Sequence, residues 1–177
     1  MRRRLALAHR VFGDPWPDVS DEALLACAEE WLDLDALAAG RGSDAASGLR
    51  GLLGWQESAR LDEVAPETIT VPSRSRIRVD YPEPGSDTSP VLAVKLQECF
   101  GWTDGPTVCD GRVRVVLHLL SPARRPLAVT DDLASFWASV YPAVRVENRG
   151  RYSKHPWPED PMTATPTKRT NRALRGN

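Results

Sequence analysis

The stretch ITVPSRSRIRVDY, residues 69–81, decides the fold class, because the spacing of apolar residues changes here from helical to alternating. In residues 69–71 and 77–81, apolar side chains fall on one face and threonine, arginine or aspartate on the other. This alternation is typical of half-buried antiparallel strands. Residues 72–75 are the expected turn between the two strands.

Downstream residues continue the pattern of short strands. The expected elements are a central strand at 91–94, a short helix at 96–100, hairpin strands at 107–109 and 112–120, and a strand at 127–130. The strand at 91–94 is placed centrally because its apolar run is too continuous for either face to meet water. The pair Asp110-Gly111 suits a type I′ hairpin turn.

Residues upstream of the deciding stretch have helical spacing. After a turn at 13–17, Asp18 or Ser20 is the expected cap of a helix that ends near Gly40. Its apolar stripe is formed by Leu24, Ala28, Trp31, Leu32 and Leu34. Shorter helices are expected at 45–53 and 55–64, with Gly54 between them and Pro66 as the terminator.

The clearest amphipathic helix is expected after Thr130, which stands where an N-cap would, with Asp131 and Asp132 in the first turn. Leucine, aromatic and valine side chains follow at helical spacing: Leu133, Phe136, Trp137, Val140 and Val144. We expect Phe136, Trp137 and Val140 to be buried on one face. Pro142 should kink or interrupt the helix.

These elements predict an α+β fold, with a helical N-terminal segment and a small, mostly antiparallel sheet. An amphipathic helix flanks the sheet, and a proline-rich C-terminal arm wraps it. We divide the chain into a helical segment at 1–65, an α+β domain at 66–167 and a basic tail at 168–177, which we expect to be disordered.

The net charge of −1 conceals two halves of opposite sign. Residues 1–65 hold 7 lysine or arginine residues against 12 acidic ones, whereas residues 66–177 hold 16 against 12. The second half is therefore the better candidate for contact with a polyanion. The alternative is that these are solvated surface charges and that their uneven distribution between the two halves arose by chance.

Cysteine usage and hydropathy indicate a cytoplasmic protein. Cys27, Cys99 and Cys109 include no CxxC pair, so neither a disulfide framework nor a zinc site is indicated. Residues 1–8 resemble the start of a signal peptide, but His9 interrupts the apolar run. No stretch approaches the roughly 18 to 20 apolar residues of a membrane span. We expect a monomer that does not bind membranes.

The sequence carries no catalytic motif: GxxxxGK(S/T), GxGxxG after a strand, GxSxG and HExxH are all missing. His9, His118 and His155 lie far apart, and His118 is expected to be a packed strand residue. The acidic pairs at 131–132 and 159–160 are better explained as capping or surface residues than as catalytic carboxylates. We therefore expect no catalytic residue, metal or cofactor in this chain.

Three basic groups are the candidate site. They comprise Arg74, Arg76 and Arg78; Arg124 and Arg125; and Arg149, Arg151 and Lys154, with Tyr152 and Trp157 beside the last group. Guanidinium groups clamp phosphate and aromatic rings stack on bases, a combination that suits single-stranded nucleic acid. In the alternative interpretation, Trp157 plugs a core and the arginines pair with acids on a neighbouring domain.

Several blocks resemble HrpB-type ATP-dependent helicases, DEAH-box relatives found in bacteria. The matching residues are 69–73 with 75–77, 90–98, 117–126, 132–137, and 149–152 with 154–161. The resemblance covers roughly residues 66–167, and residues 1–65 more loosely resemble the stretch upstream in such helicases. Arg74 replaces the family's usual glycine, Ser153 its usual proline, and Pro142 interrupts a usually continuous helix.

The resemblance implies a parent protein with two RecA-like motor domains, which bind ATP and magnesium, and this region appended at the end. The motor motifs have no matching positions here, so no catalytic residue carries over. We expect an accessory region that positions RNA or braces the motor. Two alternatives remain: a protein-interaction module with an exposed patch at Trp55, Trp102 and Trp157, or a purely structural cap.

Overall fold

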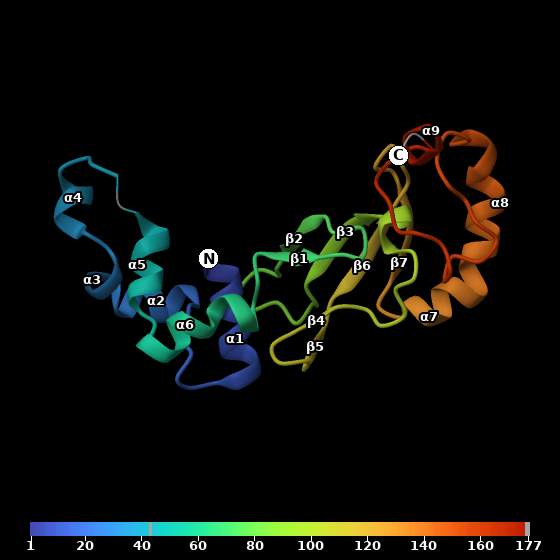
Figure 1. Cartoon of the computed structure of the whole chain (residues 1–177). Coiled ribbons are helices and arrows are strands. Elements are labelled where there is room, and N and C mark those ends of the chain that lie inside the picture. The colour runs from blue at the N-terminus through green and yellow to red at the C-terminus, as the bar shows by residue number, and fades with distance from the viewer. Residues whose placement is uncertain (43, 176–177) are drawn as a thin grey trace. The chain divides into compact units, whose positions relative to one another are not determined.

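A computed structural model describes residues 1–42 and 44–175 of the chain. Its backbone divides into two compact units (Figure 1). The first unit comprises residues 1–67, 81–89 and 108–113, and the second comprises 68–80, 90–107 and 114 onward. Helices and a mixed sheet are both present, which confirms the α+β class. The division at residues 65 and 167 stays a prediction.

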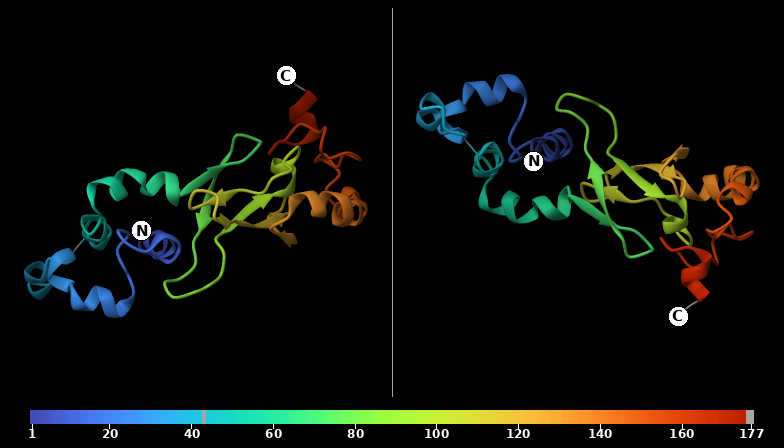
Figure 2. Two further views of the ribbon diagram at one scale, coloured as in Figure 1. Left: turned by 90° about the horizontal axis from the view of Figure 1, so that it is seen from below. Right: turned by 90° about the horizontal axis from the view of Figure 1, so that it is seen from above.

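The first unit is helical. Its helices are α1 (Arg2–Phe12), α2 (Asp21–Ala26), α3 (Ala28–Trp31), α4 (Leu34–Ala38), α5 (Ala45–Gly51) and α6 (Trp55–Val64). Helices α1 and α6 pack together, whereas α4 lies at the far end of the unit (Figures 1 and 2). The expected boundaries of α5 and α6 at Gly54 and Pro66 are confirmed. None of the described helices is long and apolar enough to cross a membrane.

The single helix expected over residues 18–40 is wrong, because the backbone leaves the helical region between its ends. Ser20 does cap the first part, since its hydroxyl oxygen accepts a first-turn amide at 3.2 Å. Leu32 then adopts an extended conformation, with φ −113° and ψ 138°. Asp33 begins a new helix by accepting the Ala36 amide at 2.8 Å. Side-chain hydrogen bonds that compete with the helix therefore divide this region.

Sequence patterning missed helix α1, whose buried face includes a charged residue. Arg4 is 3% exposed. Its guanidinium donates to the backbone carbonyls of Leu61 and Ala65 and forms ion pairs with Asp62 and Glu67. Arg4 therefore ties α1 to the last turn of α6 and the residues after it.

The second unit is built on a five-stranded sheet with the order β1-β2-β3-β6-β7. The strands are β1 (Thr68–Thr70), β2 (Arg76–Asp80), β3 (Val91–Lys95), β6 (Val116–Leu120) and β7 (Pro126–Thr130). Strands β3 and β6 pair in parallel, and the other neighbours pair antiparallel. The mostly antiparallel sheet and the central place of β3 are both confirmed. A separate short hairpin joins β4 (Thr107–Val108) to β5 (Val113–Arg114).

The two faces of this sheet differ in burial. The buried face carries leucine and valine side chains that are at most 1% exposed: Leu92, Val94, Leu117 and Leu119. On the opposite face His118 pairs in register with Ala93, and Val129 of β7 is 63% exposed. His118 itself is half-buried. Strand alternation therefore leaves one face of the sheet partly open, and Arg76, Arg78 and Lys95 lie on this face.

The amphipathic helix is interrupted before Pro142, as predicted. It consists of α7 (Leu133–Ser135), a π-helical turn, η2 (Phe136–Val140), and α8 (Tyr141–Arg151). In η2 the Tyr141 amide donates to the Phe136 carbonyl, an i to i+5 bond that moves the next inward position from Val140 to Tyr141. Phe136, Trp137 and Tyr141 are 3%, 6% and 1% exposed, whereas Val140 is 43% exposed. The predicted burial is confirmed for Phe136 and Trp137 and wrong for Val140.

The predicted turn at Asp110-Gly111 is confirmed, and the predicted helix cap at Thr130 is shifted to Asp132. Asp110 and Gly111 have φ 54° and 81°, the positive values that a type I′ turn requires. The helix cap is Asp132 rather than Thr130, because the Asp132 carboxylate accepts the Ser135 amide at 2.9 Å. The Thr130 hydroxyl instead bonds to the backbone of Asp132.

A proline-rich arm follows α8, as predicted. The Gly101 amide donates to the Pro161 carbonyl at 3.0 Å, and the Thr167 amide donates to the Gln97 carbonyl at 2.9 Å. These bonds hold the arm against η1 (Leu96–Cys99), the expected short helix. The expected disorder of residues 168–177 stays a prediction. The structure describes a short helix there, α9 (Asn171–Arg175), and residues 176–177 lie outside the described part.

Candidate nucleic-acid interface

The first basic group lies on the β1–β2 turn and on β2. Arg74 occupies the turn with a positive φ of 65°, and its amide donates to the Val71 carbonyl at 2.8 Å. Arg76 and Arg78 are exposed on the same face of β2, as alternation requires. The Arg76 guanidinium donates to the Thr68 hydroxyl of β1 at 3.0 and 3.1 Å. The strand pairing thus holds Arg76 in place.

The second basic group lies on the tight turn between β6 and β7. Ser121, which is fully buried, donates its amide to the Arg125 carbonyl and accepts the Arg124 amide, both at 2.8 Å. The Ser121 hydroxyl also accepts the Arg125 amide at 3.0 Å. This closed turn places Arg124 in the left-handed region, with φ 60°, and leaves both arginines exposed.

The sheet brings the first two groups together. Arg76 and Arg78 of β2, Lys95 at the end of β3, and Arg124 of the β6–β7 turn all line one hollow of about 370 Å³. We call this hollow the basic cavity and define it by these four cations. Arg74 and Arg125 do not line it. Its remaining lining includes apolar side chains and the carboxyl group of Glu98.

Glu98 opposes the four cations of the basic cavity. It is 5% exposed, and its carboxylate accepts the Ser73 hydroxyl at 2.7 Å. The Ser73 amide also donates to the Glu98 carbonyl at 3.3 Å. Glu98 therefore anchors the β1–β2 turn beside β2, and three positive charges remain in excess.

Lys95 is the residue of the basic cavity that sequence reasoning missed. The sequence does mark this residue, because Lys95 is the charged last residue of the otherwise apolar strand β3. Parallel pairing sets Lys95 opposite Leu120, immediately before the β6–β7 turn. Only the pairing of strands distant in the sequence brings Lys95 close to Arg124.

The third basic group lies at the C-terminal end of α8, outside the lining of the basic cavity. The Arg151 guanidinium lies 5.9 Å from the centre of the Tyr152 ring, within reach of a cation–π interaction. Lys154 is exposed two residues after Tyr152, which ends the helix. Burial, followed by the charge of Lys95, lowers the pKa of His155. The segment after α8 therefore passes close to Lys95.

The tryptophans expected to stack on bases or dock a partner differ in exposure. Trp157 is half-buried, and its indole donates to the Tyr152 carbonyl at 3.3 Å. Its own carbonyl accepts from Arg145 at 2.9 Å, so Trp157 is held within the arm. Trp102 is also half-buried, whereas Trp55 is 85% exposed.

Ion pairing separates the candidate cations from the other arginines. Within residues 1–42 and 44–175, the arginines that form ion pairs with aspartate or glutamate are Arg2, Arg3, Arg4, Arg60 and Arg145. No described ion pair involves the three basic groups. The arginine and lysine residues of these groups are exposed, and the contacts described for their guanidinium groups are those of Arg76 with the Thr68 hydroxyl and of Arg151 with the Tyr152 ring.

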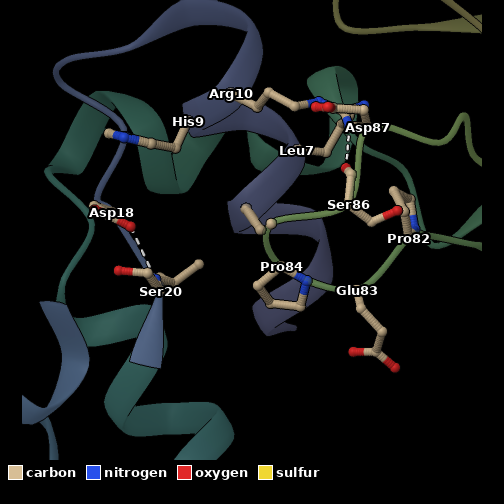
Figure 3. Close-up of a pocket in the computed structure, with 13 residues that line it drawn as sticks. Leu7, His9, Arg10, Asp18, Ser20, Pro82, Glu83, Pro84, Ser86 and Asp87 are labelled. Atoms are coloured by element: carbon tan, nitrogen blue, oxygen red, sulfur yellow. Dashed lines mark hydrogen bonds between the residues drawn. The ribbon is translucent and has the colours of Figure 1, made fainter. Parts of the chain in front are cut away.

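The first unit contains a separate cavity of about 310 Å³ between α1 and residues 82–87 (Figure 3). Arg10 lines it, but its guanidinium donates to the backbone carbonyls of Ser86 and Thr88. A backbone hydrogen bond from Ser20 lowers the pKa of Asp18, which keeps that carboxyl negative. With Arg10 engaged and acidic groups around it, this cavity does not suit phosphate.

Comparison with known proteins gives the context of this geometry. Residues 28–161 match the HrpB C-terminal family, described as ATP-dependent helicase C-terminal. The chain belongs to this HrpB family. The ATP-dependent RNA helicase HrpB of Escherichia coli (strain K12) is 47% identical over 178 residues, which cover 97% of this chain and 22% of that protein. The resemblance inferred from the sequence is thereby confirmed.

Two solved HrpB structures share the fold. The crystal structure of the E. coli DExH-box NTPase HrpB is 46% identical, with a TM-score of 0.85 over 96% of this chain. The crystal structure of the Escherichia coli DEAH/RHA helicase HrpB is 43% identical, with a TM-score of 0.68 over 88%. The chain spans only 21% and 20% of those two chains. It therefore corresponds to the C-terminal region of an HrpB-type helicase.

Proposed function

We propose that this chain is a non-motor accessory region of an ATP-dependent RNA helicase and that it holds single-stranded RNA at the basic cavity. The observation that carries the proposal is the convergence of Arg76, Arg78, Lys95 and Arg124 on one hollow. These cations come from three separate parts of the sheet, so a folded scaffold sets their spacing. Preorganised cations bind phosphate groups without first losing much side-chain freedom.

The chemistry of the cavity favours the RNA backbone over the bases. Arginine and lysine neutralise phosphates, and such contacts position a nucleic acid without reading its sequence. The half-buried Trp157 and Tyr152 lie with the third basic group and not in the cavity lining. We therefore expect weak, sequence-tolerant binding, in which the accessory region guides RNA that the motor domains translocate.

Salt dependence tests this proposal. Each phosphate contact on a single strand adds about −0.7 to the slope of log affinity against log salt, so four contacts predict a slope of about −3. Fluorescence anisotropy with a labelled single-stranded RNA of mixed sequence measures it. The double variant Arg76→Gln/Arg124→Gln should flatten the slope to about −1.5.

The third basic group supplies the matched control. Arg149→Gln/Arg151→Gln removes the same two charges outside the basic cavity and should leave the slope unchanged. A flattened slope in this control alone would assign RNA binding to the end of α8. If the unsubstituted 177-residue chain shows no salt-dependent RNA binding at low salt, this chain does not position RNA.

We further propose that this chain neither binds nor hydrolyses ATP and that ATP and magnesium bind to the motor domains of the full-length protein. Phosphoryl transfer requires a backbone cradle for the phosphates, a lysine and an acid that holds magnesium. The sequence contains no GxxxxGK(S/T) motif for such a cradle. We expect no nucleotide turnover by the purified chain, with or without RNA. Turnover that co-purifies with the chain through successive columns would contradict this.

A second candidate function is bracing of the motor domains by the first unit. Apolar side chains of its helices are exposed: Leu25 by 77%, Leu34 by 41%, Leu37 by 44% and Trp55 by 85%. Exposed apolar side chains mark a surface that binds another protein domain where they form one contiguous patch. We expect the chain to be monomeric and cytoplasmic in either role.

A further inference from the structure

We propose that a groove floored by Trp137 binds a basic peptide segment of a partner protein, through one aliphatic side chain followed by lysine or arginine. The groove has a volume of about 390 Å³. We call it the Trp137 groove; the residues that line it are Thr103, Ala134, Trp137, Ala138, Glu159, Asp160, Pro161 and Met162. It lies in the second unit, and none of its residues belongs to the basic cavity.

The floor of the Trp137 groove is rigid. The Trp137 indole donates to the Trp102 carbonyl at 2.8 Å. Its ring packs against Phe136, Tyr141 and Phe100, with centroid separations of 5.0, 5.3 and 6.1 Å. A side chain that enters the groove therefore meets a formed surface, and little binding energy is lost in ordering it.

Apart from Glu159 and Asp160, the residues that line the groove above Trp137 are small or uncharged. Ala134 and Ala138 on one side leave space above the indole, and both are exposed. Met162 also lines the groove, and its flexible side chain adapts to the shape of an apolar partner. One wall belongs to the π-helical turn η2, a feature that is frequent at functional sites.

The charge around the groove selects the partner. Two of the residues that line it, Glu159 and Asp160, are acidic. A second hollow of about 330 Å³ shares Thr103 and Ala134 with it and is lined by Asp104, Asp131 and Asp132. Arg145 pairs with Glu159 and Arg114 lines the second hollow, so the acidic groups outnumber the basic ones by five to two.

This excess of negative charge lies in the same unit as the basic cavity but has the opposite sign. Phosphates are repelled here, so RNA is not the occupant. The adjoining hollows instead suit a peptide whose aliphatic side chain contacts Trp137 while the following basic side chain reaches the acidic hollow. Asp131 and Asp132 at the start of α7 are both exposed; Asp132 already caps the helix through the Ser135 amide, so Asp131 is the aspartate that the peptide reaches there.

Synthetic peptides test the proposal on the 177-residue chain. The probe is a short fluorescein-labelled peptide that carries a leucine followed by lysines. In one comparison peptide serine replaces the leucine, and in another glutamates replace the lysines. Anisotropy should detect binding of the probe that weakens as salt is added, and affinity should fall by about tenfold or more for both comparison peptides.

Variants locate the binding. Ala138→Arg introduces a bulky cation into the groove and should weaken probe binding by about tenfold or more. Ala143→Arg makes the same change at an exposed position of α8 outside the groove and should leave binding unchanged. Asp104→Asn and Asp131→Asn should each weaken it by about two- to fivefold, whereas Glu147→Gln on α8 should not.

Thr103→Arg, at an exposed loop residue that also lines the groove, repeats the test if Ala138→Arg lowers the melting temperature. Equal effects of Ala138→Arg and Ala143→Arg, or equal binding of the lysine and glutamate peptides, would overturn the proposal. So would displacement of the probe by single-stranded RNA. Self-association that Ala138→Arg abolishes would assign the groove to a second copy of the chain instead.

Discussion

The Phe136→Ala variant is expected to lose about 3 to 5 kcal/mol of its free energy of unfolding. Phe136 is 3% exposed and lies edge-on to Trp137 at a centroid separation of 5.0 Å, so its truncation leaves a cavity within the aromatic cluster. A domain is stable by only about 5 to 15 kcal/mol, so this loss removes a large part of its stability. Urea denaturation followed by tryptophan fluorescence measures it.

Val140→Ala is the matched control for this helix. Val140 is 43% exposed because the π-helical turn directs Tyr141 inward in its place. We expect a change within about 0.5 kcal/mol, as for other surface substitutions. A cost above about 1.5 kcal/mol for Val140→Ala would indicate regular α-helical geometry over Phe136–Val140 and would contradict the π-helical register.

Replacement of Arg4 by alanine is expected to cost about 3 kcal/mol. The side chain is 4% exposed and satisfies two backbone carbonyls, those of Leu61 and Ala65, as well as two carboxylates. Its removal takes the Arg4 donor from the Ala65 carbonyl, whereas the Leu61 carbonyl still accepts the Ala65 amide at 2.9 Å, and it leaves a void between α1 and α6. Chemical denaturation of the variant measures the loss.

Arg10→Ala is the control for Arg4→Ala, because it removes a positive charge from the same helix without removing a buried side chain. Arg10 lies on the same helix but is exposed, and its guanidinium donates to the backbone carbonyls of Ser86 and Thr88. We expect a loss below about 1 kcal/mol. If Arg4→Ala and Arg10→Ala cost the same, the buried arginine does not hold α1 in place.

Much of the fold was predictable because local signals agreed with the tertiary structure. Gly54 and Pro66 set the ends of α6, and period-two alternation located β2. The predicted and observed elements differ where two local signals in the sequence compete. Asp33 and Leu32 divide a region whose apolar spacing alone predicts one helix, because the Asp33 side chain caps Ala36. Helix α1 was missed because a buried arginine does not look like a core residue.

The candidate site was predicted in part. Arg76, Arg78 and Arg124 line the basic cavity, but their convergence depends on strand order, which the sequence pattern did not specify. Lys95 was missed for the same reason. The parallel pairing of β3 with β6 joins strands separated by a hairpin, and no local signal encodes it.

Two of the arginines lie in turns whose backbone favours glycine. Arg74 and Arg124 have φ values of 65° and 60°, a conformation that costs a side-chain-bearing residue roughly 1 kcal/mol or more. Glycine at either position would relieve the turn and remove a cation. Selection for a more stable protein and selection for a more positive surface therefore act in opposite directions at these positions. An Arg74→Gly substitution would gain the relaxed turn and lose the charge.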